Sequence, residues 1–208
     1  MYEPPHFKEE RIEVLHEAIR KVRLATLVTL TPGGLEATHL PMLVDPSPAP
    51  CGRLVGHVAR ANTQWKTSSA EVEALAMFLG PHAYITPSWY ATKRETGRVV
   101  PTWNYVTVHA YGRLRFIEDA DELLGVVTRL TDRHEKSRAA PWAVDDAPPD
   151  FIRAQLKGIV GVEMTITRLQ GKWKMSQNRN VPDRQGVTEG LRQDGESAVA
   201  DLVPVPGE

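Results

Sequence analysis

Cysteine is almost absent from this chain of 208 residues, which has a single one, Cys51, between Pro50 and Gly52. One thiol cannot form an internal disulfide, so a fold held by its own disulfides is excluded and a reducing, cytoplasmic compartment is expected. A reactive thiolate would need a neighbouring base or a helix N-terminus to lower its pKa. The adjacent sequence supplies neither, so no role is predicted for Cys51.

Long hydrophobic runs are missing as well. The longest apolar stretch, residues 72–79, is interrupted by Glu73 and is far shorter than the roughly 20 residues that cross a bilayer. The first eleven residues contain Glu, Lys and Pro where a secretory signal peptide would have an apolar core. A hydrophobic content of 41% and a charged content of 25% are typical of a soluble globular protein. We therefore expect no membrane partner.

The chain also lacks an excess of basic residues. Its formal net charge is -1 and its pI is about 6.7, whereas proteins that bind nucleic acid through bulk charge are usually basic. No helix-turn-helix with a clear recognition helix is visible. DNA binding would thus need a local basic patch, for example on a dimer surface, and the sequence does not reveal one.

Several catalytic signatures are absent. There is no G-x-G-x-x-G or Walker loop, which argues against a Rossmann or P-loop nucleotide site, and no G-x-S-x-G elbow of a hydrolase. The histidines at 39, 57, 82 and 109 lack H-x-x-x-H or H-E-x-x-H spacing, so no metal site is predicted.

What the chain does have is a succession of strand patterns. An amphipathic helix is predicted over 11–22 and a hairpin over 24–44 with its turn at Thr31–Gly34. Asp119 followed by Glu122 is typical of the start of a helix. Further strands are predicted over 53–58, over 72–79 with an end at Gly80-Pro81, over 99–117, and over 159–169 with a turn at Gly171. These patterns favour a mainly β fold with flanking helices (α+β), built as a small closed or half-closed barrel.

Aromatic residues gather in the middle of the chain, interleaved with small polar residues. Rings with polar edges suit a flat heterocyclic ligand, which needs faces to stack on and hydrogen bonds at its rim. A Trp- and Tyr-rich core is the alternative interpretation. The Pro87–Tyr90 run favours a loop that closes over a ligand. The aromatic residues are Tyr84, Trp89, Tyr90, Trp103, Tyr105 and Tyr111.

Two further clusters complete the candidate site. Arg60, Asn62 and the nearby Lys66 follow a predicted strand, and such side chains can hold a phosphate by charge-assisted hydrogen bonds. Ser176, Gln177 and Asn178 could read ring carbonyls and nitrogens, although runs of this kind are also common in plain turns.

These segments resemble the PaiB-type FMN-binding negative transcriptional regulators. The resemblance extends from Met1 to about Leu191 and leaves out the loop at 46–51 and the tail after 192. The matching segments are Met1–Phe7, His57–Asn62, Gly80–Ile85, Pro87–Tyr90, Val100–Tyr105, Gly171–Lys174 and Ser176–Asn178.

The resemblance implies a split β-barrel of the FMN-binding and pyridoxamine-phosphate-oxidase type. Such barrels pair as homodimers, with FMN in a groove between subunits, and the family name implies repression of gene expression. One domain over 1–191 and a flexible tail over 192–208 are expected. The cofactor-binding residues implied are His57, Arg60 and Asn62 near the phosphate, Ser88, Trp89 and Tyr90 over the flavin, Thr102, Trp103 and Asn104 opposite, and Ser176, Gln177 and Asn178 reaching the groove.

Two rival functions stay open at this point. The same fold accommodates a flavin-dependent oxidoreductase that acts on a small molecule, because the protein groups only orient a cofactor that carries the chemistry. A split barrel that binds heme or another small ligand, using His82 or His109, is the third interpretation. The sequence alone does not decide whether the protein is an enzyme.

Overall fold

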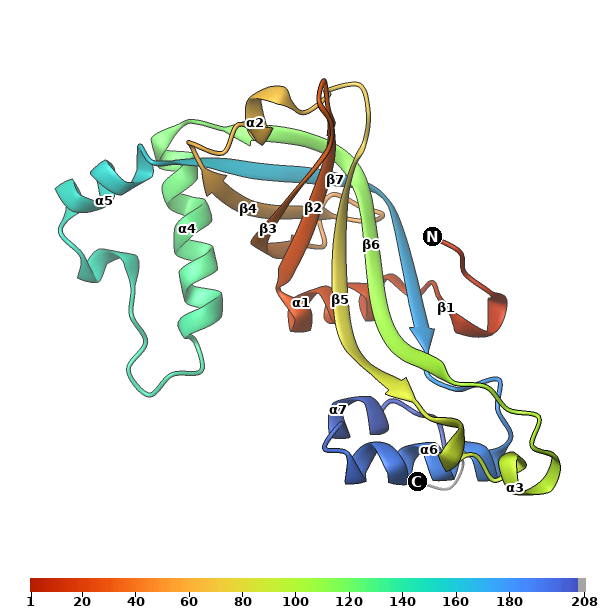
Figure 1. The fold of residues 1–208 in the computed structure, drawn as a ribbon. Helices are drawn as coiled ribbons and strands as arrows, with labels where there is room; N and C mark the ends of the chain where they lie inside the picture. The colour runs from red at the N-terminus through yellow and green to blue at the C-terminus, as the bar shows by residue number, and fades with distance from the viewer. Residues whose placement is uncertain (206–208) are drawn as a thin grey trace. The chain divides into compact units, whose positions relative to one another are not determined.

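Seven β-strands form one sheet in the computed structural model, which describes residues 1–205 (Figure 1). The strand order is β1-β7-β4-β3-β2-β5-β6, and β6 pairs with β7 as well, so the pairings close into a barrel. This confirms the mainly antiparallel split barrel with flanking helices. The elements are β1 Lys8–Glu9, α1 Ile12–Val22, β2 Leu24–Thr31, β3 Gly34–Asp45, β4 Arg53–Ala59, α2 Gln64–Thr67, β5 Ala74–Ile85, α3 Thr92–Thr96, β6 Thr102–Ile117, α4 Ala120–Glu135, α5 Pro149–Leu156, β7 Ile159–Lys174, α6 Val181–Gln193 and α7 Ser197–Ala200.

The chain divides into two compact units, and β5, β6 and β7 contribute residues to both. Unit 1 contains residues 1–15, 79–108 and the chain from Gln170 onward. Unit 2 contains residues 16–78 and 109–169. Each unit has its own buried cluster, so each is described by itself. No helix among residues 1–205 is both long enough and apolar enough to cross a membrane.

Unit 2 is built around the β2–β3 hairpin, whose turn lies at Thr31–Gly34 as predicted. Helix α4 begins where the sequence indicates, because the Asp119 carboxylate accepts hydrogen bonds from the amides of Asp121 and Glu122 and so caps the first turn. One face of α4 packs on the sheet through Leu123, Val126 and Leu130, together with Val55, Ile117 and Leu156.

Unit 1 is held together by the C-terminal helices. Asn180 caps α6 by accepting a hydrogen bond from the amide of Asp183 at 2.9 Å. The segment after residue 192, for which the sequence predicts flexibility, includes the end of α6 and all of α7, and residues 206–208 lie outside the described part. The domain over 1–191 stays a prediction. The buried cluster of this unit contains Ala83, Ile85, Tyr90, Val106, Met175, Val187, Leu191, Val199, Ala200 and Val203.

Two glycines predicted to end strands lie inside them instead. β5 continues through Gly80-Pro81 to Ile85, and a Cβ on Gly80 would lie 3.2 Å from Cβ of Val106. β7 continues through Gly171, which pairs with Glu9. A Cβ on Gly171 would lie 2.2 Å from Cδ2 of Leu15. Both predictions were wrong because these glycines allow close packing rather than a chain reversal.

Candidate functional site

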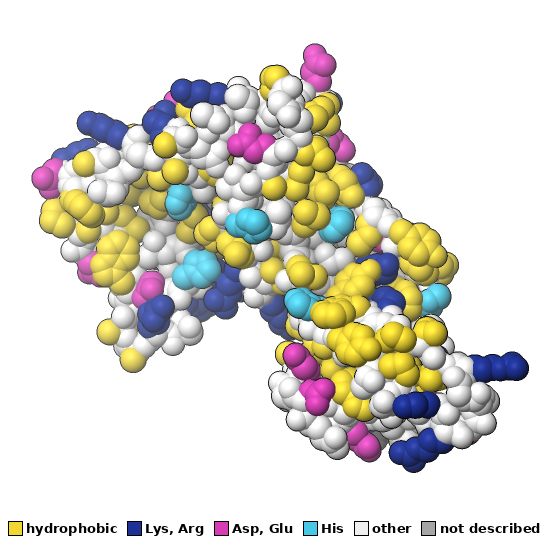
Figure 2. Space-filling view, viewed as in Figure 1, with side chains coloured by type: hydrophobic (Ala, Val, Ile, Leu, Met, Phe, Trp, Pro, Cys, Tyr) yellow, Lys and Arg dark blue, Asp and Glu magenta, His cyan; other side chains and the backbone are white. Residues whose placement is uncertain are grey.

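Three rings on unit 1 form an exposed cluster, named here the aromatic patch: His82, Tyr84 and Trp103. The ring centroid of Trp103 lies 6.0 Å from that of His82 and 6.1 Å from that of Tyr84. Tyr84 is 50% exposed and Trp103 is 48% exposed. Figure 2 shows hydrophobic side chains gathered on the surface of the part that carries α6. Exposed rings gathered in this way mark a binding surface.

The two-residue period of β5 and β6 places these rings outside. Ala83 and Ile85 on β5 are buried, and His82 and Tyr84 alternate with them. On β6 the fully buried Asn104 follows the exposed Trp103. Successive side chains of a strand point to opposite faces, so the face that carries the patch is separate from the core of the unit.

Lys174, at the end of β7, lies beside the patch. Its ammonium group donates hydrogen bonds to the Thr102 hydroxyl and, at 2.6 Å, to the Trp103 carbonyl oxygen. Burial lowers the pKa of Lys174, and the positive charges of Lys172 and Arg179 lower it further. An ammonium has three donors, and these two hydrogen bonds use two of them.

A second lysine on the same face of β7 is buried. Lys172 is 7% exposed, and its ammonium donates to the Tyr2 carbonyl oxygen at 3.0 Å. It also lies 5.3 Å from the ring centroid of Tyr105. Within residues 1–205, no carboxylate lies within 4.0 Å of the ammonium of Lys172 or Lys174. Uncompensated positive charge beside exposed rings suits a planar, anionic ligand.

Sequence reasoning missed both lysines. Their spacing of two residues near the end of a predicted strand was the available signal, because it places them on one face. The sequence pattern predicts a turn at Gly171. That turn would separate the two lysines from the preceding strand, so the predicted strand period does not extend to them.

The Pro87–Tyr90 run packs on α6. Tyr90 is 1% exposed, and the Arg179 guanidinium lies 4.4 Å from its ring centroid. Burial raises the pKa of Tyr90. Trp89 contacts α6, where a Cβ on Gly190 would come within 2.2 Å of the indole. Ser88 is exposed, and its hydroxyl accepts a hydrogen bond from Lys93 at 3.1 Å.

The predicted amide and hydroxyl groups near residue 176 are mostly used inside the unit. Asn104 donates to the Ser176 hydroxyl at 3.0 Å, and both side chains are buried. The Gln177 amide donates to the carbonyl oxygen of Trp173 at 2.5 Å. Asn178 is exposed. Thus Thr102, Trp103 and Asn178 have surface positions, whereas Asn104 and Ser176 support the fold beneath them.

Arg60 belongs to unit 2, where every nitrogen of its guanidinium has a partner. The group donates to the carbonyl oxygens of Lys157 at 3.0 Å and Ile159 at 3.2 Å, and to the Glu118 carboxylate at 2.6 Å. Arg60 also lines a cavity of about 390 Å³ with Lys157 and Arg153. To bind a phosphate, the Arg60 guanidinium would have to release the Glu118 carboxylate and donate to the phosphate instead.

Asn62 and His57 are the other predicted phosphate-side residues in unit 2. The side-chain amide nitrogen of Asn62 donates to the Thr38 hydroxyl at 2.9 Å. The side-chain oxygen of Asn62 accepts from the backbone N–H of Gln64 at 2.9 Å. Burial lowers the pKa of His57, and Nδ1 of its ring is buried without a hydrogen-bond partner among residues 1–205. The same two statements hold for His109. The roles of all twelve predicted residues toward FMN stay predictions.

Cys51 is buried, and its carbonyl oxygen is 2.8 Å from Nε2 of His16. In the part of the chain that the structure describes, no three His, Cys, Asp or Glu side chains are grouped to hold a metal ion.

The fold defines a class: split barrels like those of flavin proteins. It is similar to the flavocytochrome Anf3 from Azotobacter vinelandii, with a TM-score of 0.58, 12% identity and coverage of 80% of this chain and 69% of that one. It is equally similar to the FAD and heme binding protein from Mycobacterium smegmatis, with a TM-score of 0.58, 16% identity and coverage of 80% and 73%. At such identities the likeness concerns the fold alone.

The sequence places the chain in a particular family. The family described as "Putative FMN-binding domain" matches residues 1–168, and the chain belongs to it. The Bacillus subtilis (strain 168) protein named "Protease synthase and sporulation protein PAI 2" is 39% identical over 194 residues, which cover 93% of this chain and 90% of that protein. The resemblance to PaiB-type proteins is thereby confirmed, and FMN is the cofactor that the family supports.

Proposed function

We propose that this protein is a cytoplasmic, homodimeric FMN-binding regulator that holds the flavin against the aromatic patch. The observation that carries the proposal is the exposed Trp103 beside the Lys174 ammonium, which no carboxylate neutralises within the described chain. Bound FMN supplies reversible electron transfer and a visible absorbance. The residues present fit such a group, since they offer a ring to stack on and a cation for an electron-rich edge.

The residues of unit 1 would divide the work of binding. Trp103 and Tyr84 offer ring faces, and Lys174 and Thr102 offer polar groups at the edge of the patch. Buried and half-buried residues of unit 1 support these groups, namely Trp89, Tyr90, Asn104, Ser176 and Gln177. Ser88 and Asn178 are exposed and could reach a ligand from the surface. Arg60, Asn62 and His57 remain the predicted contacts of the phosphate.

The exposed apolar residues of unit 1 support the homodimer. Leu79 is 56% exposed and Val100 is 66% exposed, in addition to Tyr84 and Trp103 of the patch. Exposed hydrophobic residues are typical of protein interfaces when a partner covers them. A second copy of the chain on the aromatic patch would cover Tyr84 and Trp103 and enclose the flavin.

A regulatory role is supported by the Bacillus subtilis relative, whose name connects it with protease synthesis and sporulation. The net charge of -1 does not favour direct DNA binding through bulk charge. We infer that regulation follows from the flavin state or from a partner of the dimer. Steady NAD(P)H consumption by the FMN-loaded protein, measured by absorbance, would instead favour an oxidoreductase.

FMN titration followed by quenching of flavin fluorescence tests the proposal. Trp103→Ala should weaken FMN binding roughly tenfold to a hundredfold, the usual effect of losing one stacked ring. Trp142→Ala is the matched control, because Trp142 is 46% exposed but lies in unit 2. Light scattering of the 23.2 kDa chain should give the mass of a dimer. A protein that ignores FMN, or equal losses in the two variants, would contradict the proposal.

A further inference from the structure

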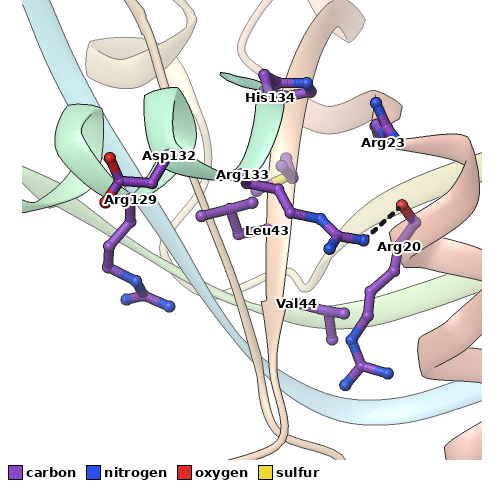
Figure 3. A pocket seen from close by; sticks show the side chains of 9 residues that line it. Arg20, Arg23, Leu43, Val44, Arg129, Asp132, Arg133 and His134 are labelled. Atoms are coloured by element: carbon purple, nitrogen blue, oxygen red, sulfur yellow. Dashed lines mark hydrogen bonds between the residues drawn. The ribbon is translucent and has the colours of Figure 1, made fainter. Parts of the chain in front are cut away.

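Unit 2 contains a strongly basic pocket whose lining includes none of the residues proposed to bind FMN. The pocket has a volume of about 290 Å³ and lies between the end of α1, the strand β3 and the end of α4 (Figure 3). Its lining contains four arginines and a single carboxylate. The lining residues, named here the basic pocket, are Arg20, Arg23, Met42, Leu43, Val44, Arg129, Asp132, Arg133 and His134.

Two of the four arginines are neutralised by neighbouring carboxylates. Arg129 donates to Asp45 at 3.1 Å, and Arg20 lies 3.6 Å from the carboxylate of Glu17. Arg133 reaches the Arg20 carbonyl oxygen at 3.5 Å, the contact drawn in Figure 3. Within residues 1–205, neither Arg133 nor Arg23 lies within 4.0 Å of a carboxylate. The pocket therefore has two guanidinium groups that no acid compensates.

The backbone of Arg23 supplies an independent indication. Its φ is 66°, in the left-handed region, directly after the last residue of α1. Glycine is the usual residue at this position after a helix, because a side chain costs free energy there. An arginine with an unpaired guanidinium in a conformation that favours glycine points to a role for the side chain.

The favourable position of a cation at a helix C-terminus explains only part of the positive charge at the basic pocket. Cations near the last turn of a helix interact favourably with its carbonyl groups, which accounts for the contact between Arg133 and the end of α1. It does not account for the convergence of cations from two helices on one cavity. Nor does it explain the apolar wall formed by Met42, Leu43 and Val44 of β3.

We propose that the basic pocket binds a small phosphorylated metabolite, a phosphate monoester with a short apolar body. Arg23 and Arg133 hold the dianionic phosphate by charge-assisted hydrogen bonds. The apolar body lies against Leu43 and Val44 of β3. A cavity of about 290 Å³ admits one small ligand and is close to the lower end of the sizes that ligand pockets show, roughly 300–1,000 Å³.

Calorimetric titration of the full-length protein with phenyl phosphate, inorganic phosphate and phenol tests this proposal. Phenyl phosphate should bind more tightly than inorganic phosphate, and phenol should not bind measurably. Combining Arg23→Gly with Arg133→Gln should weaken phenyl phosphate binding by a hundredfold or more, since each bond to a charged group is worth about tenfold or more. Glycine relieves the left-handed backbone, so this variant keeps the fold.

Lys21→Gln is the matched control, because Lys21 is in the last turn of α1, as Arg20 is, but does not line the pocket. It should retain binding within about twofold, as expected for a solvent-exposed charge that salt screens. If Lys21→Gln weakens phenyl phosphate binding as much as the double variant does, overall charge explains the loss and the proposal is overturned. A double variant that binds phenyl phosphate as the natural protein does would also overturn the proposal. FMN affinity should be the same in all variants, and its loss with Arg23 and Arg133 would make the pocket part of the flavin site instead.

Discussion

The two units of this protein compensate their half-buried cations in different ways. In unit 2, Arg53 donates to both Asp45 and Glu163 at 3.1 Å. In unit 1, Lys172 and Lys174 donate to carbonyl and hydroxyl oxygens, which carry no full charge. An ion pair on the sheet positions strands and cancels its own field. A cation held by neutral oxygens keeps its field, so the lysines are available to an anion and Arg53 is not.

The comparison is tested most strongly by removing one lysine. Lys174→Met should weaken FMN binding roughly tenfold to a hundredfold, because a hydrogen bond to a charged group contributes about 1.5–3 kcal/mol. Flavin fluorescence gives the affinity. Arg53→Met is the counterpart in unit 2 and should lower the free energy of unfolding while leaving FMN affinity unchanged. If Arg53→Met weakens FMN binding as much as Lys174→Met does, the contrast between the units fails.

A pair of glycines sharpens the same comparison at the level of packing. Gly190→Ala should lower the free energy of unfolding by about 1–3 kcal/mol, because its Cβ would lie 2.2 Å from the indole of Trp89. Gly125→Ala in α4 should raise it by about 1 kcal/mol, since no heavy atom of the described chain would lie within 4 Å of the added Cβ. Urea unfolding of both variants provides the measurement. An increase for Gly190→Ala would show that the contact between Trp89 and α6 is not tight.

The smallest expected effect concerns pH and unit 2. Burial lowers the pKa of His57 and of His109 below the ordinary value of 6.5. As the pH falls below about 6.5, the unfolded chain takes up protons that the folded protein does not, so the free energy of unfolding decreases. Each histidine contributes at most about 1.4 kcal/mol per pH unit, and only down to its folded pKa.

The measurement is urea unfolding between pH 7.5 and pH 5. His57→Gln and His109→Gln should each flatten the decrease below pH 6.5, because neutral glutamine takes up no proton in either state. An unchanged slope in both variants would assign the pH dependence to other groups.

Local signals in the sequence predicted most of the fold. The Asp119 cap and the Thr31–Gly34 turn each depend on residues close in sequence, and each was confirmed. Gly80 and Gly171 were misinterpreted because their neighbours, Val106 and Leu15, are distant in sequence. A glycine required by tertiary packing looks the same in the sequence as a glycine in a turn.

The candidate site was less predictable for a related reason. Polar residues beside aromatic ones suggested ligand contacts, but Asn104 lies on the same strand face as the buried Val106 and Val108. Extending the two-residue period back from Val108 would have placed Asn104 inside. The role of Lys174 could not be inferred in this way, because the absence of a nearby carboxylate is a property of the folded chain.

The burial of Cys51 has a practical consequence. The chain has no other cysteine, and this one is 8% exposed. A cysteine introduced at Gly33, in the exposed hairpin turn, would react with maleimide dyes far faster than the native thiol. Fluorescent labelling at one chosen position is therefore feasible without first removing the natural residue.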